Sequence, residues 1–438
     1  MDHSTHSASL PQPFPNARIA PYAWLILVQS FVTTALVFGV WFSFAVFFVV
    51  MVEDFHWSRG GAAIAFSFGN LMQAVLSPLV GLFTDRWGPR RIVVAGLVLG
   101  AVSLAACSLV QTLWHFIVLF GVGVGSGVAL AGPVSLSALL ASWFVHRRGT
   151  IIGFSFAGMG IGVKVVGPLA QHLILLLGWR QSFVFLALGI VVYTVFVALT
   201  LRNTPQDVGL QPYGAVERPP SAAAPLSGRR ASPHYWTVQQ AIRTREFWAL
   251  AIVQVLIPVG IFPISVHQVA YLVDVGFSKM FAAAILGHMG LMSACGRVGF
   301  GMLSDRLGRF GGVTLSVICS QIGIVVLLLI TDATLAWPLY LYAFFFGLGY
   351  GARGPIISAI AADLFPGRHF GTIFGLISIG HGIGGALGPW YGGYVYDRFG
   401  RYTPAFLIAL FALFGVIGCF WLATRQLGVS HRVAVGDD

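Results

Sequence analysis

Twelve long apolar stretches, separated by short polar segments, run through this 438-residue chain. A helix that crosses the hydrocarbon core of a membrane needs about 20 mostly apolar residues. The stretches are too long, and alternate too little, to be membrane strands. Only 9% of the residues are charged, whereas soluble domains carry roughly 25%. We therefore predict an all-α membrane protein with transmembrane helices at 23–52, 61–83, 92–111, 113–141, 150–177, 181–201, 247–274, 279–303, 312–331, 335–362, 370–396 and 403–424.

A long polar segment divides the stretches into two sets of six. It is rich in proline and arginine, which is typical of a linker. Within it, residues 236–245 are either a short interfacial helix or plain linker. The first residues are polar and lack the apolar core of a signal peptide, so we expect none. The predicted units are a tail at 1–22, a six-helix bundle at 23–201, a linker at 202–246, a second bundle at 247–424 and a tail at 425–438.

The two halves repeat each other in sequence. The pattern GTIIG at 149–153 recurs 222 residues later as GTIFG at 371–375, and Gly132-Pro133 recurs as Gly354-Pro355. Near these, GLFTDRWG at 81–88 recurs as GMLSDRLG at 301–308. Two parallel repeats predict a pseudo-two-fold axis along the membrane normal, with a substrate site between the halves near the midplane.

The distribution of positive charge predicts the orientation in the membrane. The net charge is +11, but the basic residues are spread thinly between spans, which argues against nucleic-acid binding. Of the 25 Lys and Arg residues, 17 fall on the side of the termini and linker, five on the other side and three inside spans. Cytoplasmic loops carry the excess of Lys and Arg. We therefore predict both termini in the cytoplasm, in an inner or plasma membrane.

Several motifs resemble those of a known family. The pattern G-x-x-x-D-R-x-G after the second and eighth spans is similar to the signature loop of the major facilitator superfamily. Stretches at 54–59 (DFHWSR), 143–149 (WFVHRRG), 204–210 (TPQDVGL) and 241–248 (AIRTREFW) resemble its monocarboxylate porter and oxalate/formate antiporter branch. The resemblance implies that the signature loops gate the two halves, through Asp85, Arg86, Asp305 and Arg306.

Three permanent cations, Lys164, Arg297 and Arg353, lie inside predicted spans. A charge near the bilayer centre costs about 2.5–3.5 kcal/mol on insertion scales, so it needs a polar cavity or a partner. All 14 acidic residues fall in loops, tails or span ends. The buried cations therefore have no evident internal carboxylate, and we expect a transported anion to be their counter-ion.

Arg297 is the first candidate for binding that anion, because a guanidinium holds a carboxylate with two parallel hydrogen bonds. The resemblance implies the same role for an arginine of the eighth span. Some members carry an aspartate one turn earlier, where this chain has Ser293, which weakens a carboxylate proton relay. Tyr350, one turn before Arg353, is a candidate for the polar wall of the site.

Lys164 and His381 are candidates for either anion binding or proton transfer. Both lie near the middle of glycine-rich spans. Histidine gains and loses a proton near neutral pH, and burial changes the protonation of lysine. The resembling oxalate/formate members carry a lysine in this region of the eleventh span, and His381 departs from that pattern. A neutral histidine that only donates a hydrogen bond is an equally good interpretation.

We therefore predict a secondary transporter of small organic anions, above all monocarboxylates, working by proton symport or anion exchange. The alternatives are a dicarboxylate or oxalate-type exchanger, an exporter of drugs or neutral solutes, and a non-transporting sensor. Neither H-E-x-x-H nor G-x-S-x-G occurs, so we expect no enzyme. The four cysteines lack metal-type spacing. We expect no cofactor, no metal and a monomer in the lipid bilayer.

Overall fold

The chain forms a helical membrane protein with two bundles side by side. The structure is a computed structural model that describes residues 21–145, 148–213, 236–365 and 370–433. The first predicted tail up to residue 20, most of the central linker and the residues after 433 lie outside the described residues. Among those described, ten segments are long and apolar enough to cross a membrane. The two other predicted spans are also helical, so the all-α prediction is confirmed.

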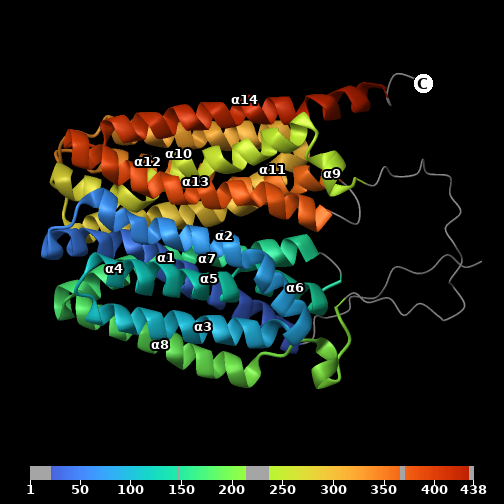
Figure 1. Cartoon of the computed structure of the whole chain (residues 1–438), viewed down its shortest axis with the longest axis horizontal. Helices are drawn as coiled ribbons and strands as arrows, with labels where there is room; N and C mark the ends of the chain where they lie inside the picture. The colour runs from blue at the N-terminus through green and yellow to red at the C-terminus, as the bar shows by residue number, and fades with distance from the viewer. Residues whose placement is uncertain (1–20, 146–147, 214–235, 366–369, 434–438) are drawn as a thin grey trace, which may run out of the picture.

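The first bundle contains the blue to green helices in the lower part of Figure 1. Five of its six predicted spans are single helices or nearly so. They are α1 (Pro21–Phe55), α2 (Arg59–Trp87), α3 (Pro89–Ala106) with η1 (Cys107–Leu109), α7 (Arg148–Leu177) and α8 (Trp179–Thr200).

The predicted span 113–141 is interrupted rather than continuous. It consists of α4 (Leu113–Phe116), a wider π-helical stretch η2 (Ile117–Val124), α5 (Gly125–Ala131) and α6 (Pro133–Trp143). Gly132 is extended between the last two. Because Pro133 has no backbone N–H to donate and clashes with the preceding turn, it starts a new helix instead of continuing one.

The second bundle contains the yellow to red helices, with α14 at the top of Figure 1. Its helices are α10 (Arg245–Val275), α11 (Lys279–Leu328), α12 (Trp337–Leu364), α13 (Phe370–Phe399) and α14 (Thr403–Val433). α11 covers two predicted spans and turns back at Gly308, where φ is 78° and ψ is 161°. Gly88, its repeat counterpart between α2 and α3, has φ of 81° and ψ of 149°. Only glycine adopts such angles readily, which explains this residue in both signature loops.

The described linker residues and the last residues of α14 lie at one end of the molecule, on the right of Figure 1, which we call the linker end. We call the opposite end the distal end. The described linker residues include η3 (Pro205–Val208) and one turn of helix, α9 (Val238–Ala241). The predicted interfacial segment 236–245 is therefore helical over α9 and at its last residue, where the next long helix begins. Phe144 and Tyr213 form an isolated parallel bridge that holds the linker against α6.

Glycines let the two bundles touch from the distal end to the middle. A Cβ added to Gly393 on α13 would lie 2.5 Å from backbone atoms of Arg59 on α2, and one added to Gly60 would lie 2.9 Å from the backbone of Tyr394. On the other flank, a Cβ on Gly160 of α7 would overlap the carbonyl of Gly290 on α11. Both seams between the bundles are therefore packed backbone to backbone.

Towards the linker end the same helix faces meet nothing. Gly153 lies two turns before Gly160 on one face of α7, and Gly375 lies two turns before Gly382 on one face of α13. A Cβ added to Gly153 or Gly375 would have no neighbour within 4 Å, and Gly81 on α2 is equally open. The bundles therefore part from the middle towards the linker end, which leaves the space between them open on that side.

Candidate functional site

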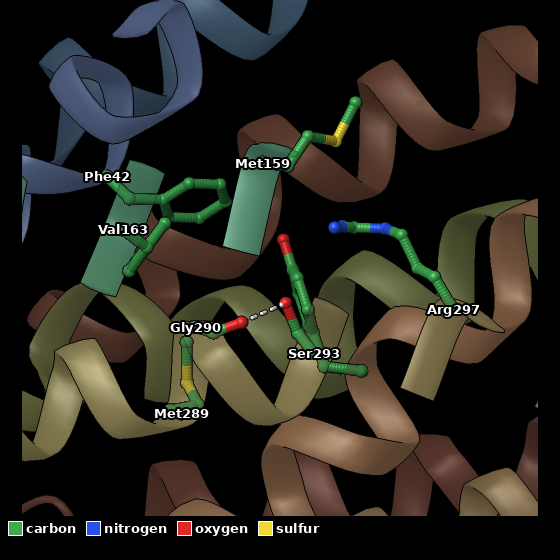
Figure 2. Close-up of a pocket in the computed structure, with 8 residues that line it drawn as sticks. Phe42, Met159, Val163, Met289, Gly290, Ser293 and Arg297 are labelled. Atoms are coloured by element: carbon green, nitrogen blue, oxygen red, sulfur yellow. Dashed lines mark hydrogen bonds between the residues drawn. The ribbon is translucent and has the colours of Figure 1, made fainter. Parts of the chain in front are cut away.

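A small pocket lies where the two bundles meet, at the inner limit of that opening. Figure 2 shows side chains from both bundles around it. The pocket is narrow in this conformation and is open on one side. The first bundle contributes α1 and α7, and the second contributes α11 and α12. The lining residues are Phe42, Met159, Val163, Met289, Gly290, Ser293, Arg297 and Tyr350.

Arg297 is the one charged side chain in that lining. It projects from α11 towards Met159 (Figure 2), and its Nη1 donates a 3.3 Å hydrogen bond to the carbonyl of Phe156 on α7. Within the described residues no carboxylate lies at ion-pair distance from it. The guanidinium therefore bridges the two bundles through a weak contact and keeps donors available for an anion.

Close approach of α11 and α12 sets the position of Arg297. A Cβ on Gly351 would overlap the Ser293 carbonyl and would lie 3.1 Å from the backbone nitrogen of Arg297. The Ser293 hydroxyl is bonded to the Gly290 carbonyl at 2.9 Å, as Figure 2 shows. This hydroxyl is therefore used within its own helix and is not directed at the pocket as a free donor.

Tyr350 completes the wall opposite the first bundle. Its ring stands edge-on to Phe42 of α1, with ring centroids 6.1 Å apart. Its hydroxyl lies within electrostatic reach of both Arg297 and Arg353. Both cations therefore make the potential at this hydroxyl more positive, which suits an added negative charge.

Arg353 is buried elsewhere, between α12 and the second part of α11. It is 2% exposed, and its Nη2 donates to the Ser320 hydroxyl and, at 3.4 Å, to the Ser316 carbonyl. Its Nε and Nη1 atoms have no partner among the described residues. It does not line the pocket around Arg297.

Lys164 also lies outside the pocket lining, although its neighbour Val163 is part of it. Its Nζ lies 3.3 Å from Nδ1 of His288 on α11. The sequence singled out the lysine but not this pairing, because no periodic pattern relates residues of two different bundles.

His381 has a side chain that is exposed, on the inner face of α13. The lipid-facing stripe of that helix includes Ile379, 50% exposed, and Ile383, 46% exposed. His381 is about 200° around the helix from each of them, and its ring packs edge-on against Phe262 at 5.9 Å. Its repeat counterpart is Met159, which lines the pocket. An exposed side chain on an inward face borders the open space between the bundles.

The signature-loop residues lie at the linker end. Asp85 and Arg86 are exposed at the last turn of α2, and Arg306 is exposed near the turn of α11. The side chain of Asp305 lies outside the described residues.

The distal end is closed by a cluster that the sequence did not reveal. Arg59 of α2 forms two hydrogen bonds with Asp274 of α10, at 2.5 and 2.7 Å. Asp397 of α13 accepts from the backbone N–H groups of Arg59 and Gly60, at 2.9 and 2.8 Å. An aspartate at a helix N-terminus satisfies otherwise free N–H groups. The available signal was the presence of Arg59, Asp274 and Asp397 at three distal span ends, but it did not specify how they pair.

Two aromatic residues and a histidine extend this cluster inward. The Arg59 guanidinium lies 3.8 Å from the ring centre of Tyr396 and donates to the Tyr402 hydroxyl at 2.9 Å. Burial raises the pKa of Tyr402, so the phenol stays protonated and can donate to His267 Nδ1 at 3.2 Å. His267 is fully buried and its Nε2 donates to the Pro389 carbonyl at 2.9 Å.

Comparisons with known proteins agree with this architecture. The model of the Major Facilitator Superfamily matches residues 30–389 and, in a second match, 309–434. Monocarboxylate transporter 13 of Bos taurus is 29% identical over 390 residues, which cover 89% of this chain and 86% of that protein. Monocarboxylate transporter 11 of Mus musculus is 25% identical over 405 residues, with 88% and 84% covered.

Solved structures show a similar fold. A bacterial homologue of the human lysosomal transporter Spinster, in an inward-facing and unoccupied conformation, matches with a TM-score of 0.71 at 15% identity, covering 92% of this chain and 97% of that one. Its inward-facing, occupied form has a TM-score of 0.69 at 16% identity. At such identity the likeness concerns the fold alone.

Proposed function

The chain belongs to the Major Facilitator Superfamily, and from that premise we propose that it carries small organic anions, above all monocarboxylates, by alternating access. It is a multi-pass membrane transporter and not an enzyme. The two bundles, 23–201 and 247–424, rock about the pocket between them so that it opens to one side at a time.

The observation that carries this proposal is the Arg297 guanidinium in the pocket between the bundles. It has no carboxylate partner among the described residues, and it already touches the first bundle through the Phe156 carbonyl. A carboxylate that accepts two parallel N–H groups of Arg297 satisfies the charge. The apolar groups of Phe42, Met159 and Val163 then suit the short hydrocarbon part of a monocarboxylate.

The names of the relatives support the same substrate class. The relatives from Bos taurus and Mus musculus are monocarboxylate transporters. This chain has Ser293 in place of the aspartate of some members, so its coupling ion, whether a proton or an exchanged anion, depends on other residues. Among the predicted site residues, we assign substrate contact to Arg297 and Tyr350 and a place beside the open cavity to His381.

The charge distribution supports a cytoplasmic linker end. With 17 of the 25 Lys and Arg residues on that side, both termini and the linker 202–246 face the cytoplasm. The conformation described above is then inward-open, with the Arg59 cluster closing the external side. The signature loops at Asp85–Arg86 and Asp305–Arg306 lie on the side that must close in the next step, so we assign them to gating.

The proposal is tested by counterflow in proteoliposomes with a panel of monocarboxylates and dicarboxylates. Arg297→Ala is expected to raise the substrate concentration for half-maximal transport by about 10- to 100-fold. Hydrogen bonds to a charged group contribute about 1.5–3 kcal/mol to binding. Arg401→Ala, an exposed distal cation, serves as the matched control and keeps wild-type kinetics.

Three results would contradict the proposal. Arg297→Ala with wild-type half-saturation would remove this residue from the site. Carboxylate binding without flux would indicate a sensor, and competition by neutral compounds but not by anions would indicate an exporter of drugs or neutral solutes. Preference for dicarboxylates would change the proposed substrate class. The second carboxylate would then be attracted by the positive charge of Arg353.

A further inference from the structure

Lys164 and His288 form a side-chain hydrogen bond between the two bundles within the membrane-spanning region. The lysine Nζ is 3.3 Å from Nδ1 and 3.4 Å from Nε2 of the histidine. Nδ1 also lies 2.8 Å from the Ala284 carbonyl, one turn earlier on α11. One tautomer fits both contacts: Nδ1–H donates to the carbonyl, and the Nε2 lone pair accepts from the ammonium. In this tautomer the imidazole accepts from Lys164 and donates to its own helix.

The pair lies next to the pocket between the bundles, beside residues that line it. Val163, next to Lys164, and Met289 and Gly290, just after His288, all line that pocket. The helices touch at this level: a Cβ on Gly290 would lie 2.6 Å from the Val163 side chain, and one on Gly287 would lie 3.1 Å from the Lys164 carbonyl. Any force between the two basic groups therefore acts directly on the helices that hold the substrate.

Few titratable groups face the pair among the described residues. Tyr340 of α12 stands edge-on to the His288 ring at 5.3 Å. Along α7, exposed His172 lies two turns towards the distal end. Along α11, Arg297 lies nine residues towards the linker end, and Lys279, whose charge is paired with Glu53 of α1, lies nine residues towards the distal end. Beside α7, the facing residues of α1 are not titratable: Phe31, Ala35 and Gly39. The described surroundings thus supply no carboxylate to neutralise a second positive charge.

We propose that the Lys164–His288 pair binds the proton that is coupled to anion transport. This inference rests on the proposed function and names its coupling ion. When the distal side of the seam is open, His288 is separated from the ammonium and accepts a proton from outside on Nε2. The bound carboxylate, in the adjoining pocket, offsets the second positive charge while the bundles rock.

Release follows from the contact seen in this structure. Once the anion leaves towards the linker end, the imidazolium and the ammonium are held together without a negative charge nearby. Repulsion expels the proton from Nε2 through the pocket to the open linker side, and the lone pair then accepts from Lys164, which fits the 3.4 Å contact in this structure. One anion and one proton cross in each cycle, so the transport is electroneutral, and the pair again holds a single charge.

The test compares wild type, His288→Gln and His172→Gln in proteoliposomes loaded with a pH-sensitive dye. The probe is whichever carboxylate gives the fastest wild-type counterflow. For one-to-one symport, each unit of inward-directed pH gradient drives about tenfold accumulation and acidifies the lumen. Wild type and His172→Gln are expected to show both effects. His288→Gln is expected to exchange carboxylate measurably. Its internal carboxylate concentration should stay about equal to the external one, and the lumen should not acidify.

A second variant tests the release step. Lys164→Gln removes the charge that expels the proton, so uptake should be slower than in wild type at a neutral internal pH and should recover as the internal pH is raised. His288→Gln or Lys164→Gln with the pH dependence of wild type would overturn the inference. So would equal impairment of His172→Gln, or wild-type exchange that ignores the pH gradient. By contrast, absence of carboxylate counterflow in wild type would overturn the proposed function itself.

Discussion

Removing the single hydroxyl oxygen of Tyr350 is a direct test of how the pocket binds its substrate. Its hydroxyl lies within reach of Arg297, whereas its ring packs on Phe42. Tyr350→Phe keeps the ring contact and removes only the hydroxyl. We expect the half-saturating substrate concentration to rise about three- to tenfold, because one hydrogen bond contributes about 0.5–1.5 kcal/mol. The maximal rate should not change.

The measurement is concentration-dependent counterflow of the preferred monocarboxylate. Tyr394→Phe, at a 55% exposed position on α13, is the control for loss of a phenol elsewhere. A Tyr350→Phe protein with wild-type half-saturation would show that the hydroxyl does not contact the substrate.

Residue-level prediction from the sequence succeeded in locating the cations but not their directions. Arg297, Lys164 and Arg353 all lie inside long helices, as predicted. Only Arg297 lines the pocket, because α12 turns Arg353 towards Ser316 and Ser320 of its own bundle. A long apolar run predicts a helix. When the helix is apolar on all sides, the run does not predict which side faces the pocket.

The seam between α7 and α11 provides a prediction at the scale of elements. A Cβ on Gly160 would overlap a backbone carbonyl of α11, which cannot move as a flexible side chain does. Gly160→Ala is therefore expected to destabilise this conformation by about 1–3 kcal/mol, seen as a melting temperature lower by several degrees in detergent.

Gly153 is the matched control for this change. It lies on the same face of the same helix, two turns towards the linker end, with nothing within 4 Å of an added Cβ. Gly153→Ala should leave the melting temperature of this conformation unchanged within about one degree. Equal melting temperatures for the two variants would contradict the packing described for the seam.

Elements were largely predictable because each span has its own apolar run. The exceptions have local physical causes. The span 113–141 breaks where Gly132 and Pro133 stop the hydrogen-bond ladder. The eighth and ninth spans form one labelled helix, α11, because the only non-helical residue between them is Gly308. Hydropathy measures the length of an apolar run, and it does not register a single residue that turns the backbone.

At the scale of the whole molecule, the sequence repeat predicted two bundles and a central site, but not the state in which they meet. Which seams are closed depends on pairings between residues more than 200 positions apart, such as Arg59 with Asp274. Those pairings differ between the conformations of a transporter, although the sequence is the same. The open linker end and the closed distal end could therefore be seen only in the structure.

The Arg59 cluster sets the balance between those conformations. Arg59 joins α2 to Asp274, to Tyr396 and to Tyr402, all in the second bundle. Arg59→Gln removes the charge and the paired hydrogen bonds, and leaves Asp274 without its partner. Losing a partly buried charged pair costs about 1–3 kcal/mol, enough to shift the ratio of distal-closed to distal-open molecules about 5- to 150-fold towards the open state.

Spin labels on cysteines at His115 and Ala333, in a background without the native cysteines, would report the distance between the distal ends of the two bundles. Wild type should give mainly one short distance, and Arg59→Gln should add a longer one. Arg180→Gln is the matched control, because Arg180 is also a distal cation but, within the described part of the chain, its side chain contacts Val110, Phe55 and Trp179 of its own bundle. If Arg59→Gln and Arg180→Gln gave the same distance distribution as wild type, the distal cluster would be a surface contact without control over the cycle. A selective shift in Arg59→Gln would instead mean that one arginine, distant from the pocket, sets how often the substrate site faces outward, and so sets the uptake rate without altering the pocket.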